Sequence, residues 1–492
     1  MFPPIQDLYR IAPEIVLCVF GMLVMFLAPV VPKARHAVLA GVALVGAALA
    51  LVSTIFPWMH QGLAYSGLFR ADAFSLFVHW IVCGTAFLVI LGSIDYLGRD
   101  DLDAAEFCAL VLFATAGMGV MAGAHELLTA FIGLEMSSIA SYILASYRRD
   151  APRSNEAAMK YFLLGSFATA FFLYGIALSF GATGSTHLDL LTPLANDSAH
   201  SLLKIGLGFI FIGLAFKVAA APFQLWTPDV YEGAPAPVTA LLSTGPKAAA
   251  FALALRILAS VDAAPPLWFW ALWVAAALSM FLGNLSAIVQ TSLKRMLAYS
   301  SIAHAGYILV AFTAAAATDH PEAGIAAALF YLVGYAVVKM GAFLIVAHLA
   351  GPEERHVNIE DFTGLARRQP AMAACLSLFL LSLLGLPITA GFLGKFYVFN
   401  AALESNLIWL AILLALNSII GAYYYLRVIV TMYMREPAAE IAVVPVPWTL
   451  AVVLWIGAFA TVFAGLFPAR IIDFAAKAAP LVSFIPSNRV SF

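Results

Sequence analysis

The sequence predicts an all-α polytopic membrane protein with about fourteen transmembrane helices. Of its 492 residues 63% are hydrophobic and only 11% are charged, and these proportions exclude a water-soluble globular fold. Apolar stretches long enough to cross the ~30 Å hydrocarbon core recur along the whole chain. In two of them prolines and glycines accompany a lysine, which predicts helices interrupted around buried charge.

Each expected helix is an apolar segment of roughly 20 residues, bounded by polar or turn-forming residues. The longest polar interruptions, 183–200 and 351–370, are too short to fold as separate domains. The N-terminal stretch lacks a positively charged region and a cleavage site, which predicts a retained span. The expected segments are 11–30, 37–56, 73–97, 106–123, 126–147, 156–181, 202–229, 236–259, 267–290, 296–317, 323–349, 370–403, 406–433 and 447–467.

The distribution of lysine and arginine predicts the orientation of these segments. With the N-terminus outside, fourteen of the 25 basic residues fall in cytoplasmic loops and seven fall in outer segments. This bias places both termini outside. The remaining four basic residues lie within spans, at Lys217, Lys247, Lys339 and Lys395.

Segments 202–229 and 370–403 are expected to be broken, because each combines helix-breaking residues with a buried lysine. Two interrupted segments at corresponding places in two halves predict an internal repeat of inverted topology. With five helices in each repeat, Lys217 would correspond to Lys395. The expected organisation is a three-helix segment 1–105, repeats 106–260 and 261–435, and a final helix and tail at 436–492.

Lys217, Lys247 and Lys395 are the strongest candidates for a transport function. Inserting a lysine at mid-bilayer costs about 2.5–3.5 kcal/mol on insertion scales. Three central lysines in one chain therefore indicate a functional role. Lysine suits proton transfer because burial readily changes its protonation, whereas arginine stays charged. The alternative for each is a side chain that reaches the interface or binds freed carbonyls. For Lys339 both interpretations stay open.

Glu135 lies near the middle of its predicted helix and needs a partner or a proton there. We expect it to pair with Lys217, so that the spacing of the pair controls where a proton is held. A purely structural ion pair is the alternative.

Three further features could extend a proton path. His304 has hydroxyl neighbours and could hand protons along a hydrogen-bonded chain, although a packing histidine explains it equally well. Lys160 is either an interface anchor or a point of proton uptake. Asp229 and Glu232 are expected to mark the end of the broken helix, and a role in proton entry or exit is the alternative.

Other functional classes find no support in the sequence. There is no dinucleotide-binding glycine motif, no Walker motif and no nucleophile elbow. We therefore expect no catalytic residue and no metal site in this chain. The four cysteines lack metal-binding spacing and are expected to pack as small apolar residues. No basic stripe is present, so nucleic acid is excluded as a partner.

Three stretches carry a resemblance to a known family: FKVAAAPFQLWTPDVYEGAPAPVTALLSTGPKAA, KRMLAYSSIAHAGY and GLPITAGFLGKFYVF. They resemble the antiporter-like membrane subunits of bacterial NADH:quinone oxidoreductase, respiratory complex I, and most closely the N-type subunit. The likeness covers essentially the whole chain. M-type relatives usually carry a glutamate where this chain has Lys395, and L-type relatives have a long C-terminal lateral helix that is missing here.

The resemblance implies fourteen helices in two inverted five-helix repeats, with helices 7 and 12 discontinuous, in a bacterial inner membrane. It implies that NADH, FMN, iron–sulfur clusters and quinone belong to partner subunits and that this chain binds no cofactor. M-type, K-type and J-type membrane subunits and the lipid bilayer are the expected neighbours. By motif, Glu135 and Lys217 resemble the family's helix 5–helix 7 pair, Lys247 its central lysine, and Lys395 the lysine that faces the outside.

This resemblance leads to a transport hypothesis. Quinone reduction in a partner separates Glu135 from Lys217, the proton of Lys217 moves to Lys247 and then Lys395, and it is released outside. Two alternatives remain: a subunit of a multisubunit cation/proton antiporter, which shares the fold, and a structural spacer, which gains nothing from buried charge.

Overall fold

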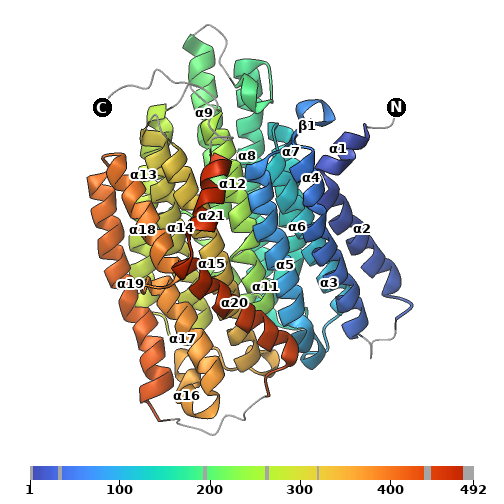
Figure 1. The fold of residues 1–492 in the computed structure, drawn as a ribbon, viewed down its shortest axis with the longest axis vertical. Helices are drawn as coiled ribbons and strands as arrows, with labels where there is room; N and C mark the ends of the chain where they lie inside the picture. Colours follow the sequence, from blue (N-terminus) through green and yellow to red (C-terminus); the bar gives the residue numbers. More distant parts are fainter. Residues whose placement is uncertain are drawn as a thin grey trace.

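The computed structural model shows a bundle of roughly parallel and antiparallel helices (Figure 1). Its description covers residues 4–31, 36–191, 197–260, 265–318, 321–436 and 445–479. The helices are α1 (Ile5–Arg10), α2 (Ala12–Leu27), α3 (His36–Ser53), α4 (Ile55–Met59), α5 (Ala73–Arg99), α6 (Ala104–Gly123), α7 (Leu127–Ala145), α8 (Pro152–Thr183), α9 (Asp197–Val218), α10 (Trp226–Gly233), α11 (Ala236–Leu242), α12 (Gly245–Ala259), α13 (Pro265–Ile288), α14 (Leu293–Ala317), α15 (Glu322–Leu349), α16 (Leu365–Arg368), α17 (Pro370–Leu384), α18 (Ala390–Glu404), α19 (Ile408–Met434), α20 (Trp448–Leu466) and α21 (Ala469–Ala478).

The predicted all-α membrane architecture is confirmed. Within the described residues, twelve segments are long and apolar enough to span a membrane. Two shorter apolar helices, α2 and α17, occupy two further expected segments. The span boundaries agree with the predicted ones to within a few residues, and the cysteines pack in or against the apolar core as expected.

The first predicted break is present and is accompanied by a second one. Residues 219–225 interrupt the chain between α9 and α10, where Ala219 adopts a left-handed backbone conformation with φ of 60°. The segment 236–259, expected as one continuous helix, is divided at Ser243 and Thr244 into α11 and α12. Pro246 lies in the first turn of α12, a position where its missing N–H costs nothing.

The break predicted in 370–403 separates α17 from α18. Gly385 ends α17 with φ of 97°, a conformation that favours glycine. Gly391 lets α18 pass close to the end of α17, since a Cβ there would lie 1.9 Å from the carbonyl oxygen of Ser382. The repeat organisation itself stays a prediction.

Two small elements were not predicted. A hairpin of β1 (Gly62–Ala64) and β2 (Phe69–Ala71) pairs Gly62 with Ala71 in antiparallel register between α4 and α5. After the last span, α21 turns back and packs against α5 and α15. Its ten residues, ARIIDFAAKA, place apolar side chains on one side and charges on the other.

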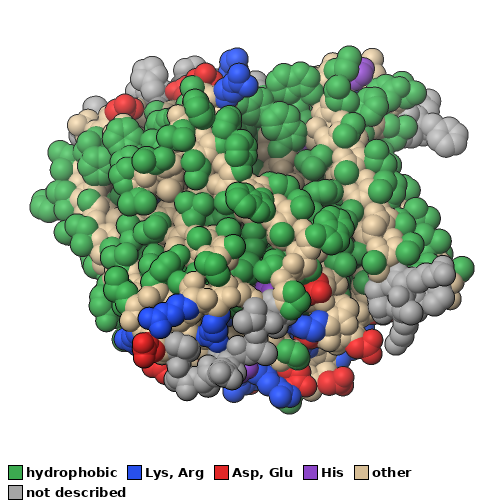
Figure 2. All heavy atoms as spheres, turned by 60° about the horizontal axis from the view of Figure 1, so that its bottom comes forward, with side chains coloured by type: hydrophobic (Ala, Val, Ile, Leu, Met, Phe, Trp, Pro, Cys, Tyr) green, Lys and Arg blue, Asp and Glu red, His purple; other side chains and the backbone are tan. Residues whose placement is uncertain are grey.

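Charge is concentrated at one end of the molecule. Figure 2 shows Lys, Arg, Asp and Glu side chains gathered at the end that lies at the bottom of Figure 1, beside α16, whereas hydrophobic side chains cover the flank. Large apolar residues such as Trp409, Trp455 and Phe459 are 74%, 74% and 68% exposed. A surface of this kind suits contact with lipid or with other membrane subunits.

Candidate functional site: a line of buried lysines

The four lysines inside the spans are all buried. The exposed fractions of Lys217, Lys247, Lys339 and Lys395 are 4%, 2%, 0% and 8%. None of them reaches the surface of the protein, which excludes a side chain that extends to the membrane interface. The other alternative, binding to backbone carbonyls, agrees with the hydrogen bonds of Lys247, Lys339 and Lys395. Within the described part of the chain no carboxylate lies within ion-pairing distance of any of them; their partners are hydroxyls, carbonyls and aromatic rings.

Lys217 lies in the last turn of α9, immediately before the break. The helix dipole stabilises a positive charge at this end. Its Nζ donates to the hydroxyl of Ser138 at 2.8 Å and to that of Tyr161 at 3.3 Å. Glu135 lies three residues before Ser138 on α7 and accepts a hydrogen bond from the Thr169 hydroxyl at 2.8 Å. Glu135 and Lys217 thus lie in one neighbourhood without a direct ion pair.

Lys247 occupies the opposite electrostatic position, in the first turn of α12. The positive end of the helix dipole disfavours a charged ammonium there, by up to about 2 kcal/mol at partly buried sites. Its Nζ donates to the carbonyl oxygen of Ser301 at 2.9 Å and contacts the hydroxyl of the same residue at 2.5 Å. That hydroxyl also bonds Tyr335 at 2.6 Å. The two lysines therefore lie at helix ends of opposite polarity, one that favours a charged ammonium at Lys217 and one that opposes it at Lys247.

Aromatic rings lie between these two lysines. Tyr161, a partner of Lys217, stacks on Trp226 at a centroid distance of 4.5 Å. Trp226 in turn meets Tyr231 edge-on at 6.0 Å, and the Tyr231 hydroxyl donates to the carbonyl of Leu242 beside the break before Lys247. The break between α11 and α12 therefore lies along the way from one lysine to the next.

Beyond Lys247 a continuous hydrogen-bonded chain starts at Lys339. Its Nζ donates to the hydroxyl of Ser300 at 2.9 Å. Ser300 bonds the hydroxyl of Tyr425, which lies 3.1 Å from Nε2 of His304. The other nitrogen of His304, Nδ1, lies 2.7 Å from the Tyr331 hydroxyl. His304 thus has a hydroxyl on each ring nitrogen, the arrangement that proton transfer through an imidazole requires.

Lys395 is the last of the four buried lysines along the chain and lies on α18, after the break that follows α17. Its Nζ donates to the carbonyl oxygen of Leu384, the last residue of α17, at 3.0 Å, where the helix dipole stabilises positive charge. The ammonium also lies 4.9 Å from the ring centroid of Tyr307. The Tyr307 hydroxyl bonds Asn284 at 3.0 Å, which connects this region to α13.

Lys160 belongs to a different cluster, at the charged end of the molecule. It is 43% exposed and pairs with Glu156 and Asp229, both at 2.8 Å. Asp229 and Glu232 of α10 each bind Arg295 of α14 at 2.8 Å. The two acids therefore tie the broken helix to the second half of the chain, and Lys160 is held beside that junction.

Three buried ion pairs were missed in the sequence. Lys294 binds Glu354 at 2.6 Å, Arg256 binds Asp72 at 2.7 Å, and His79 binds Glu14 at 2.7 Å. Asp72 and Glu354 lie in or beside polar segments and look like ordinary surface charges. A usable signal existed only for the pair in α2 and α5, since Glu14 and His79 both fall a few residues inside apolar spans.

The Glu14–His79 pair has a defined proton content. Nδ1 of His79 lies 2.6 Å from the carbonyl oxygen of Ser75, and a carbonyl can only accept, so Nδ1 carries a proton. One further proton is then required between Nε2 and the Glu14 carboxylate. The pair is neutral overall whether that proton lies on Nε2 of His79 or on the carboxyl group of Glu14.

The Ser301 hydroxyl can be tested alone. Replacing Ser301 with alanine removes the bridge from Lys247 to Tyr335 but leaves Lys247 its carbonyl partner. We expect proton pumping to fall several-fold while stability changes by only about 0.5–1.5 kcal/mol, the net value of one hydrogen bond. Pumping is measured with a pH-sensitive dye in vesicles.

The matched control is Ser93→Ala on α5, because the hydroxyl of Ser93 is equally buried and donates only to the carbonyl of Val89. Equal pumping in the two variants would show that the Ser301 bridge carries no proton.

The chain is similar to known membrane proteins over most of its length. The pattern of the family described as NADH:quinone oxidoreductase/Mrp antiporter matches residues 124–421. NADH-quinone oxidoreductase subunit N 1 of Solibacter usitatus is 49% identical over 478 residues, which cover 96% of this chain and 97% of that protein. A chain of respiratory complex I from Thermus thermophilus is 36% identical with a TM-score of 0.80, covering 94% of this chain and 99% of that chain.

A chain of the Mrp complex of Dietzia sp. superposes with a TM-score of 0.84 and covers 96% of this chain and 97% of that chain. Its sequence identity is 21%, so this likeness concerns the fold alone. The complex I chain and the Mrp chain therefore share this fold with the protein. They differ in sequence identity to it, which is 36% for the first and 21% for the second.

Proposed function

The chain belongs to the subunit N family of NADH-quinone oxidoreductases, and from this we propose that it translocates protons in the membrane arm of such a complex through Glu135, Lys217, Lys247 and Lys395. The single observation that carries the proposal is the set of four buried lysines that have no carboxylate partner among the described residues. Their burial costs stability, and a passive spacer gains nothing from it.

We propose a sequence of proton positions that follows the helix dipoles. Lys217 and Lys395 sit where dipoles stabilise positive charge, and Lys247 sits between them where a dipole opposes it. A proton leaving Lys217 passes through the less stable position at Lys247 to the chain that Lys339, Ser300, Tyr425 and His304 form, and from there to Lys395.

The driving event lies outside this chain. Quinone reduction in partner subunits moves Glu135 relative to Lys217, and the two lose the proximity that holds the proton. Moving one charge against 100 mV requires about 2.3 kcal/mol, which is within what a change in charge spacing supplies in a low dielectric.

NADH, FMN, iron–sulfur clusters and quinone are assigned to partner chains, so this subunit acts as a translocase without a redox centre of its own. M-type, K-type and J-type subunits are its proposed neighbours in a bacterial inner membrane, with both termini outside. Lys160 is proposed as the residue where protons are taken up, beside Asp229.

The proposal is tested by purifying the tagged chain in mild detergent from its own membranes and assaying NADH:quinone reductase activity. We expect the activity to co-purify with subunits that contain iron–sulfur clusters. An eluate of membrane subunits alone, without quinone reduction but with cation-dependent proton flux, would contradict the proposal and assign the chain to a cation/proton antiporter.

A further inference from the structure

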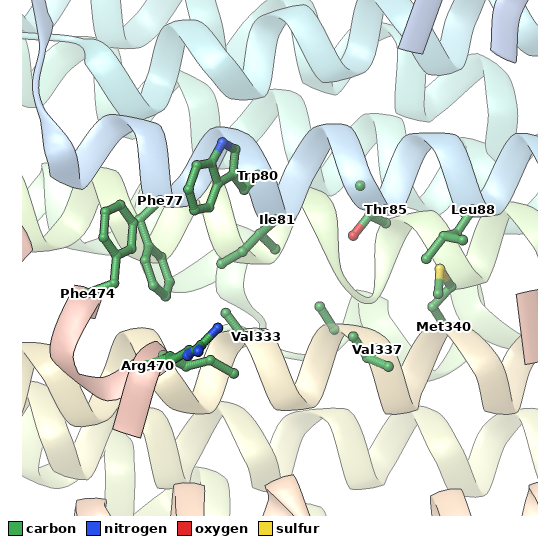
Figure 3. Close-up of a pocket in the computed structure, with 13 residues that line it drawn as sticks. Phe77, Trp80, Ile81, Thr85, Leu88, Val333, Val337, Met340, Arg470 and Phe474 are labelled. Atoms are coloured by element: carbon green, nitrogen blue, oxygen red, sulfur yellow. The ribbon is translucent and has the colours of Figure 1, made fainter. Parts of the chain in front are cut away.

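A groove of about 390 Å³ lies between α5, α15 and α21 (Figure 3), and Trp80 in its lining is 49% exposed. Phe77 and Trp80 of α5 line one end and Leu88 lines the other. Met340 faces Leu88 across the groove, and almost all of the lining is apolar. None of the lysines described above lines it, so it is separate from the proton path.

The length of the groove matches half of a bilayer. Phe77 and Leu88 are 11 residues apart on one helix, which corresponds to roughly 16 Å at 1.5 Å per residue. Half of the ~30 Å hydrocarbon core is about 15 Å. Gly84 leaves the floor hollow midway, because a Cβ placed on it would meet no atom within 4 Å.

A positive charge stands at one end only. Arg470 of α21 lines the groove beside Phe77 and Phe474, at the end nearer the start of α5 (Figure 3). It is exposed, and no carboxylate of the described residues lies within 4.0 Å of it, including Asp473 one turn away. Guanidinium groups bind phosphate through paired hydrogen bonds, and Arg470 follows the end of α20, the last span, by four residues.

We propose that this groove binds one anionic phospholipid, with an acyl chain between α5 and α15 and its phosphate on Arg470. An isoprenoid quinone tail fits the apolar wall but leaves the arginine without an anion. The lipid braces α15, the helix that carries Lys339 next to Met340.

The test counts phospholipids retained by the purified complex after delipidation and re-addition of phosphatidylglycerol or phosphatidylcholine, by mass spectrometry. Gly84→Leu fills the floor of the groove, and Arg470→Gln removes the phosphate partner. We expect the wild type to retain one more phosphatidylglycerol than either variant, with about tenfold weaker retention in Arg470→Gln. Phosphatidylcholine should be retained less than phosphatidylglycerol by the wild type only.

The matched control is Gly41→Leu on α3, which adds the same side chain at another helical glycine whose Cβ would meet open space. It should retain phosphatidylglycerol as the wild type does. Equal retention in the wild type, Gly84→Leu and Arg470→Gln overturns the proposal. A quinone or a protein segment that is lost from Gly84→Leu, with phospholipid unchanged, also overturns it. Because Arg470→Gln is a surface change, the test stands even if Gly84→Leu fails to assemble.

Discussion

Replacing Lys217 with alanine is expected to reduce NADH-driven proton pumping at least about tenfold, because each proton moved against 100 mV needs ~2.3 kcal/mol that this site can no longer store. Quinone reduction should fall with it, since the two processes are coupled. The variant should still fold, because Ser138 and Tyr161 can bond each other or water once the ammonium is gone. NADH oxidation and pumping are measured together in reconstituted vesicles.

The informative comparison is Lys217→Arg, which keeps a positive charge but does not release a proton at physiological pH. It should pump as poorly as the alanine variant. Lys204→Ala is the control on the same helix, because Lys204 is exposed near the other end of α9. Full pumping by Lys217→Arg would mean that the charge matters and the proton does not, and the proposed role of Lys217 would be wrong.

The sequence alone predicted the elements whose signals are local. Long apolar segments predict spans because the bilayer sets their length. Gly385 and Pro387 predict the break before Lys395 because a helix cannot pass through them unchanged. The buried lysines were predictable for the same reason, since a charge deep in an apolar segment has no aqueous alternative.

The missed features depend on contacts between distant segments. Glu354 lies in a polar loop, and only the fold shows that it meets Tyr96, Ala236 and Lys294 from three different helices. The break between α11 and α12 left one unused signal, Pro246, because a proline in the first turn of a helix marks a new start. The chain from Lys339 to His304 could not be predicted, since it joins side chains of α14, α15 and α19.

The Glu354 contacts define a junction beside the proposed proton path. Its carboxylate accepts from the Tyr96 hydroxyl at 2.8 Å, from the Ala236 backbone N–H at 2.6 Å and from Lys294 at 2.6 Å. Burial alone would raise the pKa of Glu354, but the Lys294 charge and these hydrogen bonds outweigh burial and hold the pKa below its ordinary range. Glu354 thereby fixes the start of α11, the half-helix that precedes Lys247.

Lys294→Met should destabilise the assembled protein by about 3–5 kcal/mol, because it leaves the Glu354 carboxylate buried without its counter-charge. The double variant Lys294→Met/Glu354→Gln should recover much of this loss, since no buried charge remains. Thermal unfolding of the purified complex measures both. Arg355→Ala is the control, because Arg355 and Glu353 form a neighbouring pair that is 69% and 64% exposed and contributes little.

The pH dependence of Lys294→Met separates a charge effect from a packing effect. In the wild type the lowered pKa of Glu354 means that its stabilisation is fully present above about pH 4.3 and is lost only as the pH falls through the lower native value. Without Lys294 the pKa of Glu354 rises, so the carboxyl takes up a proton at a higher pH. The destabilisation caused by Lys294→Met should therefore become smaller as the pH is lowered from about 8 to about 5. A loss that stays constant over that range would show that Lys294 contributes through packing, and that the junction does not depend on its charge.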